Sequence, residues 1–378
     1  MKNTSLEVRY LGTRALELPV QLQLNSITPF EQGAQPLPTF INASDIPATL
    51  PATAPNLAQF QAFINNPLTA RRFAAQGFRG GAITIESPVG ASTYHGGAVE
   101  LLHRFSHGLL LRANYTYAKA MDNATNDLNT SAVNPRRPEN SYNLANEWSR
   151  SALDVTHKVG LTWLYDLPKY KFDSRILRGA ANGWQWSGSY LFQSGQPVTI
   201  QSGTDSNGNL DAAGDRAILN AAGVGNTGST VVAVCRDPAT GATFVSSAGT
   251  PCGTGAAAAQ NTVGYVAANP NARYIQAGAG ALSNLGRNTF NSPYFNVWNM
   301  SILKNNQFTE RFNLQLRVDA FDVFNHRQYT FGQLSVLGTN TNALSQGYAN
   351  LTSGSAFLNQ FLFNGGSRTV QLGIKLTY

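Results

Sequence analysis

Several segments of the chain alternate apolar and polar residues with a period of two over about ten residues, as transmembrane β-strands do. The clearest is the last segment, where Val370, Leu372, Ile374, Leu376 and Tyr378 fall on one face and polar residues or glycine lie between them. Successive side chains of a strand point to opposite faces of the sheet. The pattern therefore predicts a strand with one apolar face.

Eight strands of this kind are predicted. They cover residues 6–13, 93–105, 109–121, 153–166, 183–196, 294–304, 311–325 and 368–378. In a longer alternative, the first strand continues to residue 24. Short connections lie at 106–108, 167–182 and 305–310, and long ones at 25–92, 122–151, 197–293 and 327–367. Bacterial outer-membrane barrels have short periplasmic turns and long extracellular loops. We therefore expect an all-β fold, an antiparallel transmembrane β-barrel segment with both chain ends on the periplasmic side.

The composition supports a protein that crosses the membrane with β-strands. Only 12% of the residues are charged, against about 25% in ordinary soluble domains. The alternative is a soluble β-sandwich binding module, whose strands also alternate in polarity. Sandwich strands average only about 5–6 residues, and such a domain rarely needs so few charges on its outer face. The barrel is therefore the favoured interpretation.

Charged residues on the polar faces of these strands are candidates for the lumen lining. They are Glu100, Arg104, Arg112, Arg317 and Asp319. Polar lumen lining is the rule in such barrels, so we expect these side chains to pair across strands or to contact a plug.

Five segments resemble the barrel of TonB-dependent outer-membrane transporters, in particular the Oar-like group. They are residues Leu6–Arg14, Gly97–Asn123, Ser151–Pro168, Glu310–His326 and Arg368–Tyr378. The resemblance implies a location in the bacterial outer membrane and a barrel that holds a plug. It also implies that the long loops bind a scarce solute, whose uptake is driven by the TonB system through the plug.

The terminal strand has a second implied role. Its alternating apolar residues and final aromatic are similar to the signal that the barrel-assembly machinery recognises, which assigns this role to Val370, Leu372, Ile374, Leu376 and Tyr378. The simpler interpretation is that these residues face outer-membrane lipid. Both interpretations can hold together.

The sequence departs from the family pattern. Transporter barrels have about 22 strands around a plug, and neither a signal peptide, a plug domain nor a TonB-contacting segment is found in this sequence. We therefore expect the C-terminal part of a larger barrel, an open sheet that needs further strands and is prone to aggregate at its edges. The alternative is a self-sufficient eight-stranded barrel whose long loops serve a structural or adhesive role.

One loop carries oxygen-bearing side chains at alternate positions. Asp205, Asn207, Asn209 and Asp211 alternate, and Asp215 follows. The first part of an EF-hand calcium loop uses this spacing, but the Glu expected at the twelfth position is absent. Calcium is therefore one candidate occupant of the 205–215 loop. The other interpretation is a solvated turn cluster of Asp, Asn and Gly.

Both cysteines of the chain lie in one loop. Cys235 and Cys252 flank a stretch rich in Gly, Ala, Ser and Thr. In an oxidising compartment such a pair favours a local disulfide. The alternative is two free loop thiols.

Enzymatic chemistry and nucleic-acid binding are not expected. The sequence contains no Walker loop, HExxH, GxSxG or zinc-type cysteine set. The net charge is +7, but the basic residues are scattered and form no stripe that could follow a phosphate backbone.

Overall fold

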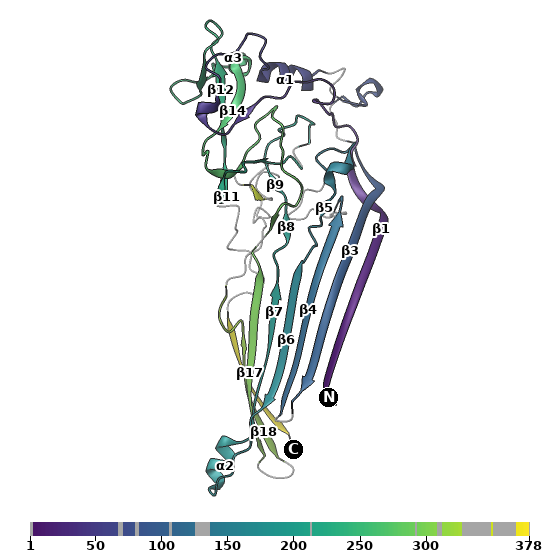
Figure 1. The fold of residues 1–378 in the computed structure, drawn as a ribbon, viewed down its shortest axis with the longest axis vertical. Helices are drawn as coiled ribbons and strands as arrows, with labels where there is room; N and C mark the ends of the chain where they lie inside the picture. The colour runs from purple at the N-terminus through teal and green to yellow at the C-terminus, as the bar shows by residue number, and fades with distance from the viewer. Residues whose placement is uncertain are drawn as a thin grey trace.

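The structure is a computed structural model in which a long antiparallel sheet carries a loop region at one end (Figure 1). It describes residues 3–66, 71–79, 83–105, 108–124, 137–211, 214–291, 293–307, 312–326, 349–350 and 368–377. The expected all-β class is confirmed, because strands dominate the described residues and the helices are short. No helix in these ranges is long and apolar enough to cross a membrane.

The main sheet contains eight long strands, each hydrogen-bonded to the next along one path. In spatial order they are β1 (Thr4–Gln23), β3 (Thr84–Arg104), β4 (Leu109–Asp122), β6 (His157–Asp166), β7 (Trp184–Gln193), β17 (Phe295–Gln307), β18 (Asn313–Phe321) and β20 (Thr369–Thr377). The two-residue strand β5 (Ser149–Arg150) also pairs with β4. Each long strand overlaps one of the eight predicted from the sequence, in the same order.

The predicted strand ends differ most in the first half of the chain. Strand β3 begins at Thr84, nine residues before its predicted start, and pairs there with β1. Strand β1 runs to Gln23, which agrees with the longer of its two predicted forms. Strand β6 begins four residues later than predicted, at His157. The preceding residues form a turn, in which the buried Asp154 accepts hydrogen bonds from the Ala120 N–H (2.7 Å) and from Arg150 (2.7 Å). At residues 153–156 these polar contacts take the place of the regular hydrogen bonds between strands.

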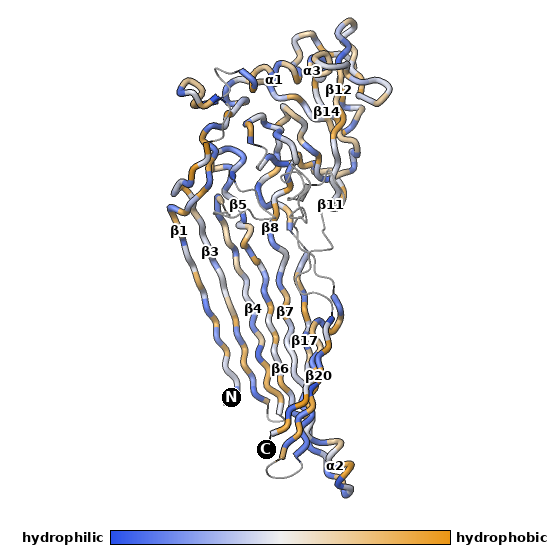
Figure 2. The backbone as a smooth tube through the Cα atoms, turned by 180° about the vertical axis from the view of Figure 1, so that it is seen from behind, coloured by the Kyte–Doolittle hydropathy of each residue, from blue (hydrophilic) through white to orange (hydrophobic). Residues whose placement is uncertain are grey.

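The register gives the sheet one apolar and one polar face. Residues paired across strands point to the same face, and one such row joins Val8, Val99, Tyr115, Val159 and Phe192. The residues between these positions are mainly polar, as the alternating colours along the strands in Figure 2 show. Apolar side chains exposed on a sheet face are suited to contact with lipid.

The sheet is open in the part of the chain that the structure describes. Strand β1 pairs only with β3 along its length, and β20 pairs only with β18. The amino and carboxyl termini lie near the lower end of the sheet in Figure 1, on the side of helix α2 (Arg175–Ala181) in the β6–β7 connection. The described parts of the long connections lie at the opposite end, as the alternating lengths predict.

The long connections fold into a loop region with its own small sheets. Its strands are β2 (Thr39–Phe40), β8 (Pro197–Val198), β9 (Ile200–Gln201), β10 (Ile218–Leu219), β11 (Val224–Ser229), β12 (Val231–Arg236), β13 (Thr243–Val245), β14 (Thr262–Ala267), β15 (Ala272–Ile275), β16 (Phe290–Asn291) and β19 (Ala349–Asn350). Its helices are α1 (Leu57–Ile64), α3 (Ala256–Asn261) and the 3-10 turns η1 (Ala43–Asp45), η2 (Ala74–Gln76) and η3 (Leu144–Glu147). Buried residues such as Phe60, Val234 and Ile275 form its apolar cores.

Aromatic side chains pack together on the apolar face of the main sheet. Trp163 is 8% exposed and its ring centroid lies 5.2 Å from that of Trp186. Trp298 stacks on Tyr190 with centroids 4.1 Å apart. Gly188 on β7 is paired with Trp163 on β6 and leaves room for its indole ring. Such rings are typical of the band where a membrane strand meets lipid.

Candidate functional site

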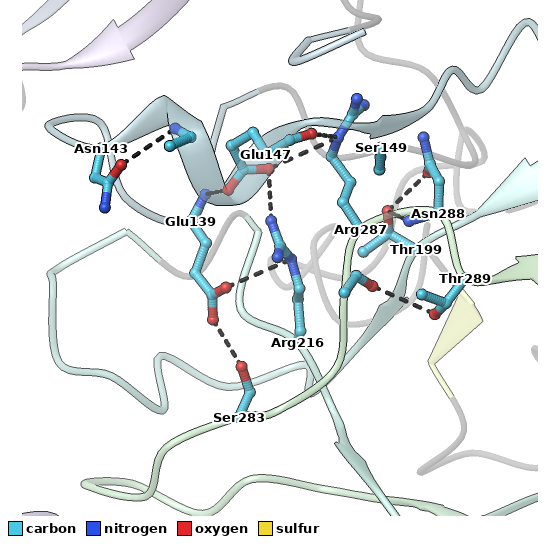
Figure 3. Close-up of polar contacts among 12 residues, drawn as sticks. Glu139, Asn143, Glu147, Ser149, Thr199, Arg216, Ser283, Arg287, Asn288 and Thr289 are labelled. Carbon is cyan, nitrogen blue, oxygen red and sulfur yellow. Dashed lines mark hydrogen bonds and ion pairs between the residues drawn. The ribbon is translucent and has the colours of Figure 1, made fainter. Parts of the chain in front are cut away.

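A network of ion pairs, drawn in Figure 3, lies in the loop region and is largely buried. At its centre is Glu147, the last residue of η3, whose side chain is 2% exposed. The Arg216 Nη2 atom lies 2.5 Å from its Oε2 atom, and Arg287 donates to its backbone oxygen at 2.8 Å. A charge this deeply buried is tolerated only when it is paired and hydrogen-bonded. The three residues therefore hold each other in place.

The network extends to β4 and to the 137–147 segment. Arg287 donates to the backbone oxygen of Asp122 at 2.5 Å and to its carboxylate, at the end of β4. The Arg216 Nε atom lies 3.4 Å from Glu139, which also accepts a hydrogen bond from the Ser283 hydroxyl at 3.0 Å. Burial raises the pKa of Glu139 although the charge of Arg216 opposes it. The network thus joins the loop region to the main sheet.

A pocket of about 260 Å³ adjoins this network. Its lining includes Glu31, Glu139 and Glu147, several amide and hydroxyl side chains, and the ring of Phe30. Asn140 donates to Glu31 at 2.8 Å. Polar groups converging on a concave site beside an aromatic ring are suited to a small polar solute. Of its lining, sequence reasoning singled out Asn207 and Asn209, as calcium ligands, and missed the pocket itself because its residues are far apart along the chain.

The structure does not bring the five predicted calcium ligands together. The Asp211 carboxylate is bound by Arg137 in a bidentate pair, with Nη2 to Oδ1 at 2.7 Å. The side-chain oxygens of Asn207 and Asn209 accept backbone N–H groups two residues further on. No three His, Cys, Asp or Glu side chains in the described ranges are grouped as metal ligands. The other two predicted ligands, Asp205 and Asp215, have no ion-pair partner among the described residues.

The structure contains a disulfide between Cys235 and Cys252. Cys235 lies in β12, and Cys252 precedes α3; both are buried. Their Cα atoms are 5.1 Å apart, within the usual range for a disulfide. The bond ties the residues that precede α3 to β12, whose Val234 packs in an apolar cluster with Val263 and Val266 of β14.

The predicted lumen residues all lie on the polar face of the main sheet. They are Glu100, Arg104, Arg112, Arg317 and Asp319. Arg112 pairs with Glu100 across β3 and β4 at 2.8 Å. Arg317 pairs with Asp319 on its own strand at 2.7 Å. Four of the five residues thus form two local pairs, while Arg104 lies at the end of β3, and the five do not converge on one site.

The terminal strand presents its apolar residues on the other face. Val370, Leu372, Ile374 and Leu376 lie on β20, and Ile374 is 78% exposed. Tyr378 lies outside the described residues. The role of this strand as an assembly signal stays a prediction.

An open sheet of long antiparallel strands with one apolar and one polar face is the fold of an outer-membrane β-barrel protein. The chain belongs to the outer membrane beta barrel domain family, whose profile matches residues 1–371. Among solved structures, the outer membrane transporter YddB from Escherichia coli is similar with a TM-score of 0.35 and 9% identity. That match covers 100% of this chain and 30% of the transporter chain. None of the curated proteins compared with the chain matches it.

Proposed function

We propose that this chain forms part of the barrel of a TonB-dependent transporter of the Oar-like group, and that it contributes to solute binding and uptake rather than to catalysis. The observation that carries the proposal is the open edge of the main sheet on both sides. Strands β1 and β20 each have one neighbour among the described strands. An unpaired backbone group in lipid costs several kcal/mol. Further strands that continue the sheet remove this cost.

The loop region supports a role in solute binding. It contains a polar pocket held by buried ion pairs, at the end of the sheet that the long connections occupy. In the proposed transporter this end faces the outside of the cell. We expect the missing strands, a plug and the TonB system, acting through the plug, to complete the transport cycle.

The edges give a direct test. A photo-crosslinking amino acid is placed at Val8 on β1 and, separately, at Leu372 on β20, in the outer membrane of the native bacterium. We expect adducts with barrel strands outside residues 1–378, together with co-isolation of TonB. The matched control is a crosslinker at Val159 on β6, a strand that has neighbours on both sides. It should give no adduct with strands outside residues 1–378.

Adducts that join Val8 only to β20 would overturn the proposal. They would show a closed eight-stranded barrel that stands alone. A chain recovered entirely in the aqueous fraction without detergent would also overturn it, because that is the behaviour of a soluble sandwich.

A further inference from the structure

The loop region gathers more negative than positive charge around the ion-pair network. The negative charge comes from a cluster of six carboxylates, those of Asp122, Glu139, Glu147, Asp205, Asp211 and Asp215. Three guanidinium groups contact this cluster, those of Arg137, Arg216 and Arg287. The first three of the six carboxylates, and that of Asp211, each lie within ion-pair distance of an arginine. Asp205 and Asp215 are the two that make no ion pair among the described residues, so the cluster lacks positive charge at their position.

Asp215 is buried completely and has an oxygen with no partner. Its Oδ2 atom accepts the Ser206 N–H at 2.9 Å, which places the carboxylate against the Asp205–Ser206 peptide. Its Oδ1 atom is buried and has no hydrogen-bond partner in the described part of the chain. A buried carboxylate oxygen without a donor is costly unless a cation or a proton occupies its free side.

The neighbouring residues present further oxygens in the same state. Asp205 accepts the Leu210 N–H through Oδ2 at 2.9 Å, while its Oδ1 atom is buried without a partner. The hydroxyl oxygen of Ser206 is likewise buried and unpartnered. Burial, followed by the negative charge of Asp205, raises the pKa of Asp215 well above its ordinary value. Three unsatisfied oxygen atoms thus lie on adjacent residues and on the carboxylate packed against them.

We propose that Asp205 and Asp215, with the Ser206 hydroxyl, form a calcium-binding site in the loop region. Calcium takes oxygen ligands from carboxylates, neutral side chains, backbone carbonyls and water in flexible geometry. Two carboxylates therefore suffice when neutral oxygens and water complete the shell. The cation supplies the positive charge that the surrounding arginines do not.

Magnesium fits the site less well. It demands near-ideal octahedral geometry and keeps most of its own water, whereas the Asp215 side is closed to solvent. A shared proton between the two aspartates is the other way to satisfy Asp215. Direct measurement of bound calcium separates a proton from a metal ion.

The test is calcium binding to the full chain, refolded in detergent micelles and stripped with EDTA. Equilibrium dialysis with calcium-45 should give one ion per chain, with a Kd of about 10⁻⁴ to 10⁻³ M as in extracellular calcium modules. The isosteric variants Asp215→Asn and Asp205→Asn should each weaken binding at least about tenfold, because the charge of the ligand set tunes affinity. Ser206→Ala keeps both carboxylates and should weaken it less.

Asp237→Asn is the matched control. Asp237 is an aspartate of the same loop region, but its Oδ1 atom already accepts the Ala239 and Thr240 N–H groups. This variant should bind calcium as the unmodified chain does. An intact Cys235–Cys252 disulfide and an unchanged near-ultraviolet circular dichroism spectrum show that each variant is folded.

Two results would overturn the proposal. One is an unmodified, folded chain that binds no calcium at calcium concentrations 10-fold above the expected Kd range. That result leaves a proton as the group that satisfies Asp215. The other is unchanged binding in folded Asp215→Asn and Asp205→Asn variants, which places the ion elsewhere. Since neither variant lies at a sheet edge, failure here leaves the transporter proposal intact.

Discussion

Arg216 and Glu147 form a buried ion pair of 2.5 Å between segments 69 residues apart in the sequence. Glu147→Gln removes the negative charge that faces both Arg216 and Arg287. Breaking one partner of a buried pair typically costs about 3–5 kcal/mol. We expect amide hydrogen exchange across 137–150 and 276–289 to become faster by the factor that this loss of free energy corresponds to.

The exposed pair of Glu7 and Arg9 provides the control for this experiment, since both side chains are more than half exposed. Glu7→Gln should cost less than about 1 kcal/mol. Equal exchange in Glu147→Gln and the unmodified chain would show that the network does not hold the loop region.

The pH dependence of the loop region should reverse when calcium is added. Burial and neighbouring carboxylates raise the folded pKa of Asp215 above the ordinary 3.8, so the folded state binds this proton more tightly than the unfolded state does. The local free energy of unfolding therefore falls as the pH rises from about 4 through the raised pKa. In EDTA at neutral pH, Asp215→Asn should be the more stable protein.

Hydrogen exchange over 200–216 measures this effect as the difference between the unmodified chain and Asp215→Asn at each pH. In saturating calcium the difference should favour the unmodified chain as the pH rises, because the metal binds the deprotonated carboxylate. A difference that does not change with pH in EDTA would contradict the raised pKa.

Reducing the Cys235–Cys252 bond should loosen β12 and β14. The two cysteines are 17 residues apart in sequence, and closing a loop of roughly this size stabilises a fold by about 3 kcal/mol. We expect the double variant Cys235→Ser/Cys252→Ser to be cut by protease between 231 and 267 far faster than the oxidised chain. Dithiothreitol should accelerate cleavage of the oxidised chain and leave the rate of the double variant unchanged.

The main sheet was predictable from sequence because its signal is local. In β18 and β20, apolar residues recur at every second position, so the period alone gives the strand and its two faces. The predicted bounds were wrong where polar contacts end the strand pairing, as at Asp154, and where β3 begins nine residues early, at Thr84. Nothing in the short-range pattern encodes those contacts.

The loop region was not predictable in the same way. Strands β12 and β14 carry the runs VVAVC and TVGYVA, which are short apolar segments within long Gly- and Ala-rich connections. The ion-pair network joins Asp122, Glu147, Arg216 and Arg287. These residues are far apart along the chain, so their pairing produces no periodic pattern in the sequence. The Asp205 loop was visible as a pattern, but the diversion of Asp211 to Arg137 appears only in three dimensions.

Gly188 should tolerate no side chain, because the indole ring of Trp163 occupies the space above it. A Cβ atom there would overlap the ring and lie 2.7 Å from the Asn299 backbone oxygen. Overpacking of this kind costs about 1–3 kcal/mol. We expect Gly188→Ala to lower the urea midpoint in micelles, followed by tryptophan fluorescence. Gly97→Ala is the control, since a Cβ atom at Gly97 meets nothing within 4 Å.

A charge on the apolar face of β20 should block insertion into lipid. Ile374 is 78% exposed in the middle of this strand, and a lysine at the bilayer midplane costs about 2–4 kcal/mol in a barrel. Folding into short-chain lipid vesicles, measured by the gel-mobility shift of unheated samples, should fall in Ile374→Lys. Gln371→Lys adds the same charge to the opposite face, beside Asp319, and should fold as well as the unmodified chain. Equal folding of both variants would mean that lipid does not contact this face, and a soluble sheet would then explain its pattern.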